Sequence, residues 1–205
     1  MQPLVSIICL CYNHKKFVGN AIQSVLNQTY PNIELIVLDD ASNDGSVDEI
    51  LRTLKDYPEV KFLALKNNNG NCKAFNFALG KTKGDFIIDL AADDILLPER
   101  VATGVMTFQH HGPKWGVNFC DAAYIDEDSN FIRNHYKRER NGKLKSRVPE
   151  DDVYEEILKK YYICPPSFMA RREVFDHLGG YDESLAYEDF DFFVRSSRNF
   201  KFCYS

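Results

Sequence analysis

The chain has 205 residues, a net charge of -5 and a composition that is 44% hydrophobic and 27% charged, which indicates one globular domain with a sizeable core. A general nucleic-acid binder usually carries a basic balance, so the acidic charge argues against nucleic acid as a partner. No apolar run approaches the roughly 18 residues that span a bilayer.

Residues 1–100 predict an alternation of strands and helices. Apolar runs of strand length occupy residues 4–10, 34–38, 60–65 and 85–90. Helical patterns lie between them, over residues 17–26, 46–57 and 72–82. Ser46 and Glu49 have the spacing of a capping box at the start of the second helix. This alternation predicts a mainly parallel, Rossmann-like sheet flanked by helices, with a ligand site at the carboxyl ends of its strands.

The second half of the chain, 101–205, is less regular and predicts a smaller antiparallel part. Residues 115–126 and 130–136 have the pattern of two strands around an acidic turn. Seven Lys or Arg side chains accompany a single acid in residues 133–147, which predicts a mobile basic loop. Helical patterns and a final strand-like run follow over residues 150–162, 171–178 and 200–205. We expect one domain whose C-terminal part is truncated.

Polar residues stand at the carboxyl end of each predicted parallel strand. They are Asn13 after the first, Asp40 after the second, residues 67–71 after the third, and Asp93 with Asp94 after the fourth. Any one of them has a plain interpretation as a turn residue, because Asn, Asp and Gly dominate turns. The complete series favours a binding site, since this edge is where open α/β sheets bind ligands.

Two familiar phosphate and calcium motifs are absent from these loops. The run "GKT" at residues 80–82 imitates the end of a P-loop, but Phe75 stands where that motif requires a glycine. The acidic run that begins at Asp40 imitates a calcium loop, but its twelfth position is Leu51 instead of a bidentate glutamate. The chain also lacks the G-x-G-x-x-G fingerprint of dinucleotide binding.

The adjacent acids Asp93 and Asp94 need a positive partner. Two carboxylates at the end of a buried strand repel each other and lose hydration, so a cation is expected there. Carboxylate oxygens are the ligands that Mg²⁺ and Mn²⁺ prefer. A metal held there would stabilise negative charge that develops on a departing group during a reaction.

Three stretches of the sequence, residues 5–46, 68–100 and 179–195, resemble a family 2 glycosyltransferase with the GT-A fold. The resemblance covers nearly the whole chain. It implies an inverting enzyme that moves a sugar from a UDP- or dTDP-linked donor to an acceptor hydroxyl, in polysaccharide or cell-surface glycan synthesis. It also implies a nucleotide-sugar-binding half, residues 1–100, and an acceptor-binding half, residues 101–205.

The resemblance assigns roles to individual residues. The nucleotide is expected to contact Leu10, Tyr12, Asn13, Asp40, Asn68, Gly70 and Lys73. Asp94 is expected to bind Mg²⁺ or Mn²⁺, with Asp93 on the donor sugar or ribose. Asp189 is expected to be the catalytic base, and Glu188 to orient it or contact the acceptor. Asp191 is a competing candidate for the base, but it lies about 200° round a helix from Asp189.

The sequence departs from the family pattern at two places. The common motif Asp-Ala-Asp-Asp is Ala91-Ala92-Asp93-Asp94 here, so one carboxylate is missing. The family often has an arginine before the asparagine of its third helix, whereas Phe75 precedes Asn76 in this chain. Lys73 is then the nearest cation for the donor diphosphate.

Two other functions stay open at this stage. A metal-dependent nucleotidyltransferase would also use paired acids, but it needs a glycine-rich basic loop after its first strand, and "CYNHKK" has no glycine. A non-catalytic nucleotide-sugar or glycan-binding module is compatible with the missing acid, whereas the Glu188-Asp189 pair argues against it.

The remaining expectations concern partners and location. The acceptor is expected to be a glycan or a lipid-linked molecule, and residues 133–147 form either a solvated flap or a contact for an anionic acceptor or a membrane surface. The six cysteines lack C-x-x-C spacing, and the first residues lack the features of a signal peptide. These features favour the cytoplasm, with the inner face of the membrane as one possible place.

Overall fold

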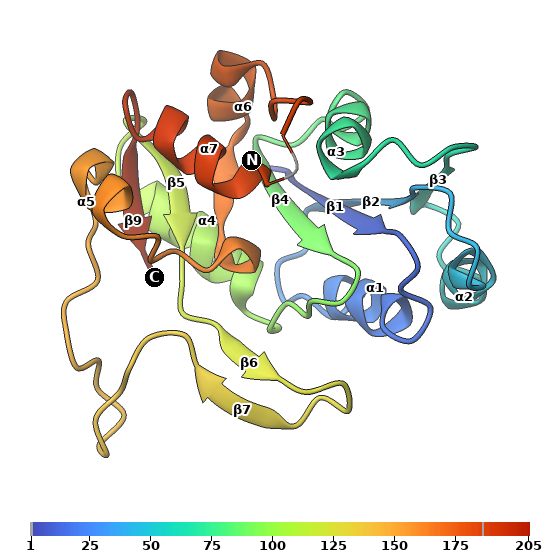
Figure 1. The fold of residues 1–205 in the computed structure, drawn as a ribbon, viewed down its shortest axis with the longest axis horizontal. Helices are drawn as coiled ribbons and strands as arrows, with labels where there is room; N and C mark the ends of the chain where they lie inside the picture. Colours follow the sequence, from blue (N-terminus) through green and yellow to red (C-terminus); the bar gives the residue numbers. More distant parts are fainter. Residues whose placement is uncertain (1, 186) are drawn as a thin grey trace.

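The computed structural model describes residues 2–185 and 187–205 of the chain. Its centre is a seven-stranded sheet with the strand order β3-β2-β1-β4-β8-β5-β9, accompanied by a two-stranded sheet of β6 and β7 (Figure 1). This mixed α/β architecture with a mainly parallel sheet confirms the predicted fold class.

The first half of the chain builds the parallel part of the sheet. Its strands are β1 (Val5–Cys11), β2 (Ile33–Asp39), β3 (Lys61–Ala64) and β4 (Phe86–Ala91). Its helices are α1 (Val18–Leu26), α2 (Ser46–Thr53), α3 (Asn71–Leu79) and α4 (Arg100–His110). All three strand pairings in this part are parallel, as the alternation of strands and helices predicts. The carboxyl ends of these strands therefore meet at one edge of the sheet.

The second half completes the same sheet and adds the hairpin. Its strands are β5 (Trp115–Phe119), β6 (Ala123–Ile125), β7 (Phe131–Asn134), β8 (Met169–Arg171) and β9 (Lys201–Tyr204). Its helices are α5 (Tyr154–Lys159), the 3-10 helix η1 (Pro165–Ser167), α6 (Arg172–Leu178) and α7 (Glu188–Ser196). Strand β8 runs antiparallel between β4 and β5, and β9 runs parallel to β5. The predicted segment 115–126 is thus two strands in two different sheets.

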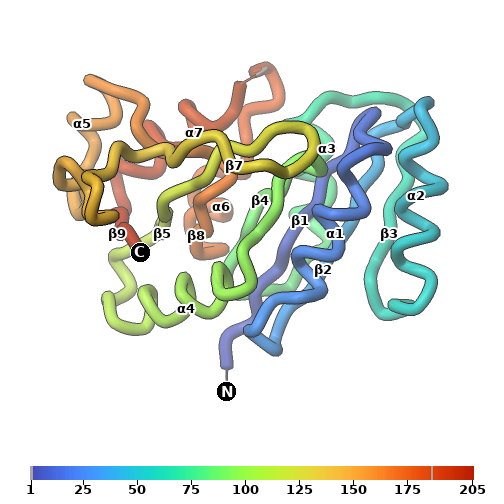
Figure 2. Tube along the Cα trace, turned by 90° about the horizontal axis from the view of Figure 1, so that it is seen from below, coloured from blue at the N-terminus to red at the C-terminus, as the bar shows by residue number. Residues whose placement is uncertain are grey.

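Two apolar clusters cover the two faces of the central sheet. One contains Phe75 of α3, Phe175 of α6 and Phe192 of α7. The other contains Ile22 of α1 and Val105 of α4. Successive residues of each strand alternate between these clusters, because neighbouring strand side chains point to opposite faces. Figure 2 shows the strands between the helix layers.

The predicted capping box of α2 is wrong. The residue before the helix is Gly45, with a φ of 92°, and no side chain caps the helix. Ser46 is the first helical residue, and its hydroxyl donates to Asp44 Oδ1 at 2.5 Å and accepts from the backbone N–H of His14. The cap-like spacing is used instead to fasten α2 to the loop after β1.

The hairpin β6–β7 extends from the body beside the carboxyl edge of the main sheet (Figure 1). Its tip reaches the start of α1, where Glu127 Oε2 lies 2.8 Å from Lys16 Nζ. The basic loop follows β7 and is fastened by Arg138, which pairs with Asp121 at 2.6 Å and donates to the carbonyl oxygen of Gly142. Among the described residues, no helix is long and apolar enough to cross a bilayer.

Candidate active site

A cavity of about 480 Å³ opens at the carboxyl edge of the sheet. Strands β1 and β4 and the residue after β2, Asp40, form its floor, and residues at the start of α3 and α7 form its walls. Its lining consists of Leu10, Cys11, Tyr12, His14, Asp40, Asn68, Gly70, Asn71, Ala74, Asp89, Ala91, Asp94, Pro165, Pro166, Phe168, Glu188 and Asp189. Eight of the eleven residues with predicted roles are in this lining; Asn13, Lys73 and Asp93 are outside it.

The nucleotide-binding residues predicted at β1 and β2 lie together at one end of the cavity. Asp40 is buried, and its carboxylate accepts the backbone N–H groups of Asn69 and Gly70 at 2.9 Å. Tyr12 is 45% exposed, so its ring is available for stacking. The acid at the end of β2 thus holds the loop that follows β3, which brings two strand ends to one site.

Asn13 has a structural task beside the cavity. Its φ of 56° lies in the left-handed region, which asparagine tolerates better than most residues. Its backbone N–H donates to Ser42 Oγ at 2.8 Å, and its side-chain oxygen accepts the N–H of Asn43 at 2.9 Å. Asn13 therefore joins the loops that follow β1 and β2, and it shapes the cavity from behind.

The two acids after β4 face different surroundings. Asp94 lines the cavity, and burial, followed by the nearby charge of Asp93, raises its pKa to about 6. The side chain of Asp93 is 50% exposed, and its Oδ1 lies 3.7 Å from His14 Nδ1. Asp93 also lines a second cavity, of about 220 Å³, together with the tip of the β6–β7 hairpin.

The two acids that begin α7 also differ. Asp189 lines the cavity, and burial, then the charges of Glu188 and Asp94, raise its pKa to about 7. Glu188 is buried and accepts a hydrogen bond from the side chain of Asn71. Cys72 Sγ lies 3.6 Å from the other carboxylate oxygen of Glu188. Glu188 therefore connects the start of α7 to the start of α3, and Asp189 is left facing the cavity.

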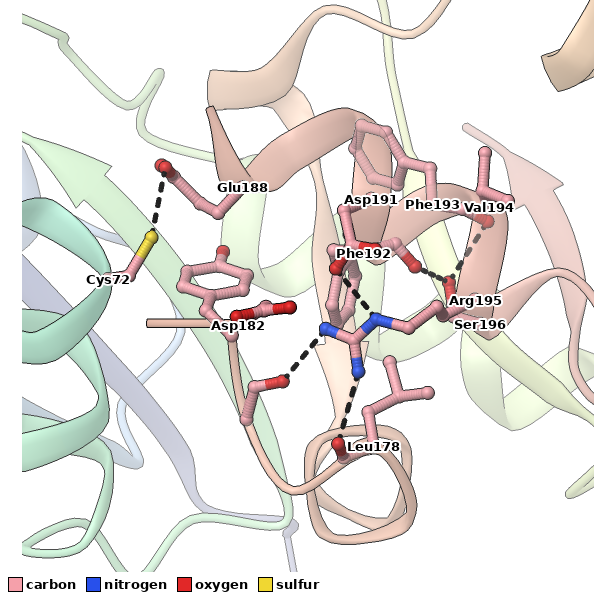
Figure 3. A network of polar contacts seen from close by, with 12 residues as sticks. Cys72, Leu178, Asp182, Glu188, Asp191, Phe192, Phe193, Val194, Arg195 and Ser196 are labelled. Carbon is pink, nitrogen blue, oxygen red and sulfur yellow. Dashed lines mark hydrogen bonds and ion pairs between the residues drawn. The ribbon is translucent and has the colours of Figure 1, made fainter. Parts of the chain in front are cut away.

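Asp191, the competing candidate for the base, is engaged elsewhere. Its Oδ2 accepts from Arg195 Nε at 2.6 Å, and Arg195 also donates to the carbonyl oxygens of Leu178 and Gly180. Figure 3 shows this network beside α6, while Glu188 points the other way, towards Cys72. Asp191 is not in the cavity lining, so the geometry favours Asp189.

Nine lining residues had no predicted role, and His14 and Asp89 are two of them. His14 follows the first strand, directly after Asn13. Asp89 lies within β4, four residues before Asp93, and Tyr181 donates to its carboxylate at 3.0 Å. A polar residue inside an otherwise apolar strand was the available signal for Asp89.

The residues of the cavity fit a divalent cation that arrives with a diphosphate. Five carboxylates line it, whereas His14 is the single basic residue among the described lining positions. An anionic diphosphate would be repelled by this charge unless a cation accompanied it. The described residues contain no group of three or more His, Cys, Asp or Glu that could hold a metal ion.

Comparison with known proteins gives the same assignment. The family model described as Glycosyl transferase family 2 matches residues 6–179, which is most of the chain. The chain belongs to glycosyl transferase family 2. Relatives include an uncharacterized glycosyltransferase of Rickettsia typhi, 29% identical over 198 residues, and a chondroitin synthase of Escherichia coli, 30% identical over 200 residues. These alignments cover 96% and 95% of this chain but 59% and 26% of the relatives, so the chain spans only part of their length.

Solved structures of glycosyltransferases share the fold. A mannosyltransferase from Pyrobaculum calidifontis, in complex with GDP-Man and Mn²⁺, has a TM-score of 0.72 at 17% identity. The match covers 100% of this chain and 55% of that one. TarS of S. aureus in complex with UDP-GlcNAc has a TM-score of 0.69 at 19% identity, over 98% of this chain and 58% of that one. The predicted family and the GT-A fold are therefore confirmed, and membership of the family supports the predicted assignment as a transferase.

Proposed function

We propose that this glycosyltransferase moves a sugar from a UDP- or dTDP-linked donor to an acceptor hydroxyl, with inversion at the anomeric carbon. The carrying observation is that one cavity contains Asp94, beside which a metal-bound diphosphate would lie, and Asp189, a carboxylate with a raised pKa. Relatives such as the chondroitin synthase support a role in polysaccharide or glycan synthesis.

The donor would lie along the floor of the cavity, with its nucleotide at the β1–β2 end. Tyr12 would stack on the base, and Asp40 would accept a ring N–H. Leu10, Asn68 and Gly70 would enclose the ribose and base, with Asn13 fixing the loop behind them. Lys73 is exposed on α3 outside the cavity lining, so it would act on the donor only through a longer-range attraction.

A divalent cation, Mg²⁺ or Mn²⁺, would be held by Asp94 and by oxygens of the donor, with Asp93 towards the ribose or sugar. When bound, it stabilises the negative charge of the departing diphosphate. The complex of the Pyrobaculum mannosyltransferase with Mn²⁺ and GDP-Man supports this assignment.

Asp189 would accept the proton of the acceptor hydroxyl as that oxygen attacks the anomeric carbon. A general base works best when its pKa lies near the working pH, and burial together with neighbouring acids brings that of Asp189 to about 7. The oxygen–hydrogen bond breaks towards Asp189, the new glycosidic bond forms, and the nucleoside diphosphate leaves with the bonding electrons. The incoming oxygen attacks opposite the leaving group, so the configuration inverts.

The acceptor would approach from the side of β6–β7, α5 and η1, as a glycan or a lipid-linked molecule. The basic loop 133–147 stays a proposal for contact with an anionic acceptor or a membrane surface, which would place the enzyme in the cytoplasm near the inner leaflet. A non-catalytic binding module is disfavoured because Asp189 lines the cavity and has a pKa raised to about 7, as a proton acceptor requires.

A thermal-shift panel tests the proposal. UDP, dTDP and GDP, with and without their sugars and Mn²⁺, are compared by the melting temperature, because a ligand that binds the native state raises it. We expect the largest shift for a uridine or thymidine compound with Mn²⁺. No shift for any nucleotide would contradict the proposed function, and an equal shift for UDP and GDP would contradict the assignment of the base.

A further inference from the structure

Asp89 is a carboxylate on the floor of the cavity, and no loop or turn requires it. It lies inside β4, between Ile88 and Leu90, which are buried on the opposite face with α1 and α4. The strand alternates, so Asp89 and Ala91 share the face that lines the cavity. An acid in the middle of a buried strand costs desolvation energy, so its presence needs a reason outside the fold.

The position of Asp89 is fixed by Tyr181. Tyr181 donates its hydroxyl to Asp89 Oδ2 at 3.0 Å, and its ring is buried 4.4 Å from the centroid of Phe75. Both backbone groups of Tyr181 bond the side chain of Asn76 at 2.9 Å. This arrangement holds the hydroxyl rigidly and leaves the Oδ1 side of Asp89 towards the cavity; within the described part of the chain, Tyr181 is its one polar partner.

The charge around Asp89 favours its neutral form. Burial, then the charges of Asp189, Glu188 and Asp94, raises its pKa well above the ordinary value, and the bond from Tyr181 opposes this only in part. A neutral carboxyl group accepts at one oxygen and donates at the other. With Oδ2 occupied by Tyr181, the free oxygen presents a donor to the cavity.

The roles proposed for the other acids of the cavity indicate which ligand Asp89 would meet. Asp94 lies where the diphosphate would bind, and Asp189 lies where the acceptor would lose its proton. The group between them in the reaction is the transferred sugar, whose hydroxyls are hydrogen-bond donors and acceptors. The small side chain of Ala91, at the position of the missing motif acid, leaves Asp89 open to the cavity.

We propose that Asp89, held by Tyr181, binds a hydroxyl group of the donor sugar and contributes to the choice of sugar. This inference rests on the proposed function and adds a residue that the motif does not include. A site that hydrogen-bonds a substrate hydroxyl discriminates against an analogue that lacks it or presents it elsewhere, because its own polar group is then left unpaired.

The test measures the contribution of the sugar to binding separately from that of the nucleotide. Dissociation constants are measured by calorimetry with Mn²⁺ for UDP, UDP-Glc and UDP-GlcNAc, and for GDP and GDP-Man. The quantity compared is the ratio of the sugar-nucleotide constant to that of its own diphosphate. For Asp89→Leu we expect this ratio to rise about 10-fold for the preferred sugar, with diphosphate affinity changed less than about 2-fold.

Two further variants keep the result interpretable. Asp89→Asn preserves a carbonyl for Tyr181 and a donor towards the cavity, so its ratio should stay within about 3-fold of the parent. Tyr181→Phe leaves the carboxyl but frees its rotation, so its ratio should lie between those of the Asn and Leu variants.

Three results would overturn the inference. An unchanged ratio in Asp89→Leu would show that the sugar is not read at this position. An equal loss for sugar nucleotide and diphosphate would assign Asp89 to the cavity's general shape. Failure of the parent to bind any of the five compounds, or dTDP and dTDP-Glc measured beside them, would contradict the proposed function itself, which the diphosphate measurements distinguish from a failure at Asp89.

Discussion

The acid pairs Asp93–Asp94, after β4, and Glu188–Asp189, at the start of α7, share one organisation. In each pair the first acid is engaged beside the cavity: Asp93 lies near His14, and Glu188 is bonded to Asn71. The second acid faces the cavity, and its pKa is raised to about 6 or about 7 by burial and by its partner's charge. Burial thus favours the protonated form of the second acid in each pair, and the charge of the first acid adds to that effect.

The two pairs differ in what should relieve the repulsion between their two carboxylates. We propose that Asp94 meets a cation that arrives with the donor, and binding that cation would lower the pKa of Asp94. Asp189 should instead stay free of the cation, because a base that is bound to metal cannot accept a proton. The comparison teaches that the same local device, two adjacent acids, can prepare a metal ligand or a proton acceptor according to what approaches it.

The largest expected effect is the loss of sugar transfer when Asp189 is replaced. Asp189→Asn removes the proton acceptor and nearly preserves shape, so sugar transfer should fall by about 10²–10⁴ while donor binding survives. The measurement is the transfer rate beside the donor dissociation constant. Asp191→Asn is the matched control, because it breaks the ion pair with Arg195 away from the cavity. Loss of transfer in the control alone, with Asp189→Asn active, would exchange the two assignments.

The next largest effect is the loss of metal-dependent nucleotide binding when Asp94 is replaced. Asp94→Asn should weaken Mn²⁺-dependent binding of UDP by about 2–5 kcal/mol, the range for truncating one partner of a buried charge pair. Binding without metal should change little. Calorimetry with and without Mn²⁺ measures both, and Asp93→Asn, which changes the exposed neighbour, should lose less. Unchanged metal-dependent affinity in Asp94→Asn would remove it from the metal site.

The third prediction concerns nucleotide binding by Asp40, whose carboxylate is held by backbone N–H groups. Asp40→Ala should weaken UDP binding by about 1–3 kcal/mol, the range for a hydrogen bond to a charged group. The variant also releases the N–H groups of Asn69 and Gly70, which would weaken every nucleotide alike. A loss that is larger for UDP than for GDP therefore supports base recognition, and equal losses support a purely structural role for Asp40.

Much of this organisation could be predicted because it is local in sequence. Strands β1, β2 and β4 are mainly apolar and are followed by polar residues, so their edge and acids such as Asp40 and Asp94 follow from the pattern. The acid pair at Asp189 required the family resemblance, because no periodicity places α7 beside the edge of the sheet.

The missed features depend on contacts far apart in the chain. Strand β8 has only three residues, and its place between β4 and β5 is set by pairing across more than eighty positions. Asp89 is held in place by a hydrogen bond from Tyr181, ninety-two residues later. The error at Ser46 has the same cause, since its hydroxyl is used by His14 in another loop. Local sequence patterns predict the helices and strands, whereas the contacts between distant residues are set by the fold.

The smallest expected effect is on stability, and it separates the two pairs most directly. A folded-state pKa above the unfolded value means that the native protein binds the proton more tightly, so stability falls as pH rises from about 4 to the folded pKa. Both Asp94 and Asp189 have raised values. At pH 8, Asp189→Asn and Asp94→Asn should therefore each be more stable than the parent, by about 1–2 kcal/mol once screening in the open cavity is included.

Thermal unfolding at pH 8 and pH 5 measures this gain, which should shrink at pH 5, where the parent acids approach their neutral forms. Adding Mn²⁺ and UDP at pH 8 then separates the two acids. The gain of Asp94→Asn should reverse, because the parent binds the metal complex more tightly and is stabilised by it. The gain of Asp189→Asn should persist, since that acid is not a metal ligand. A reversal in both variants would mean that Asp189 also contacts the metal and is unsuited to act as the base.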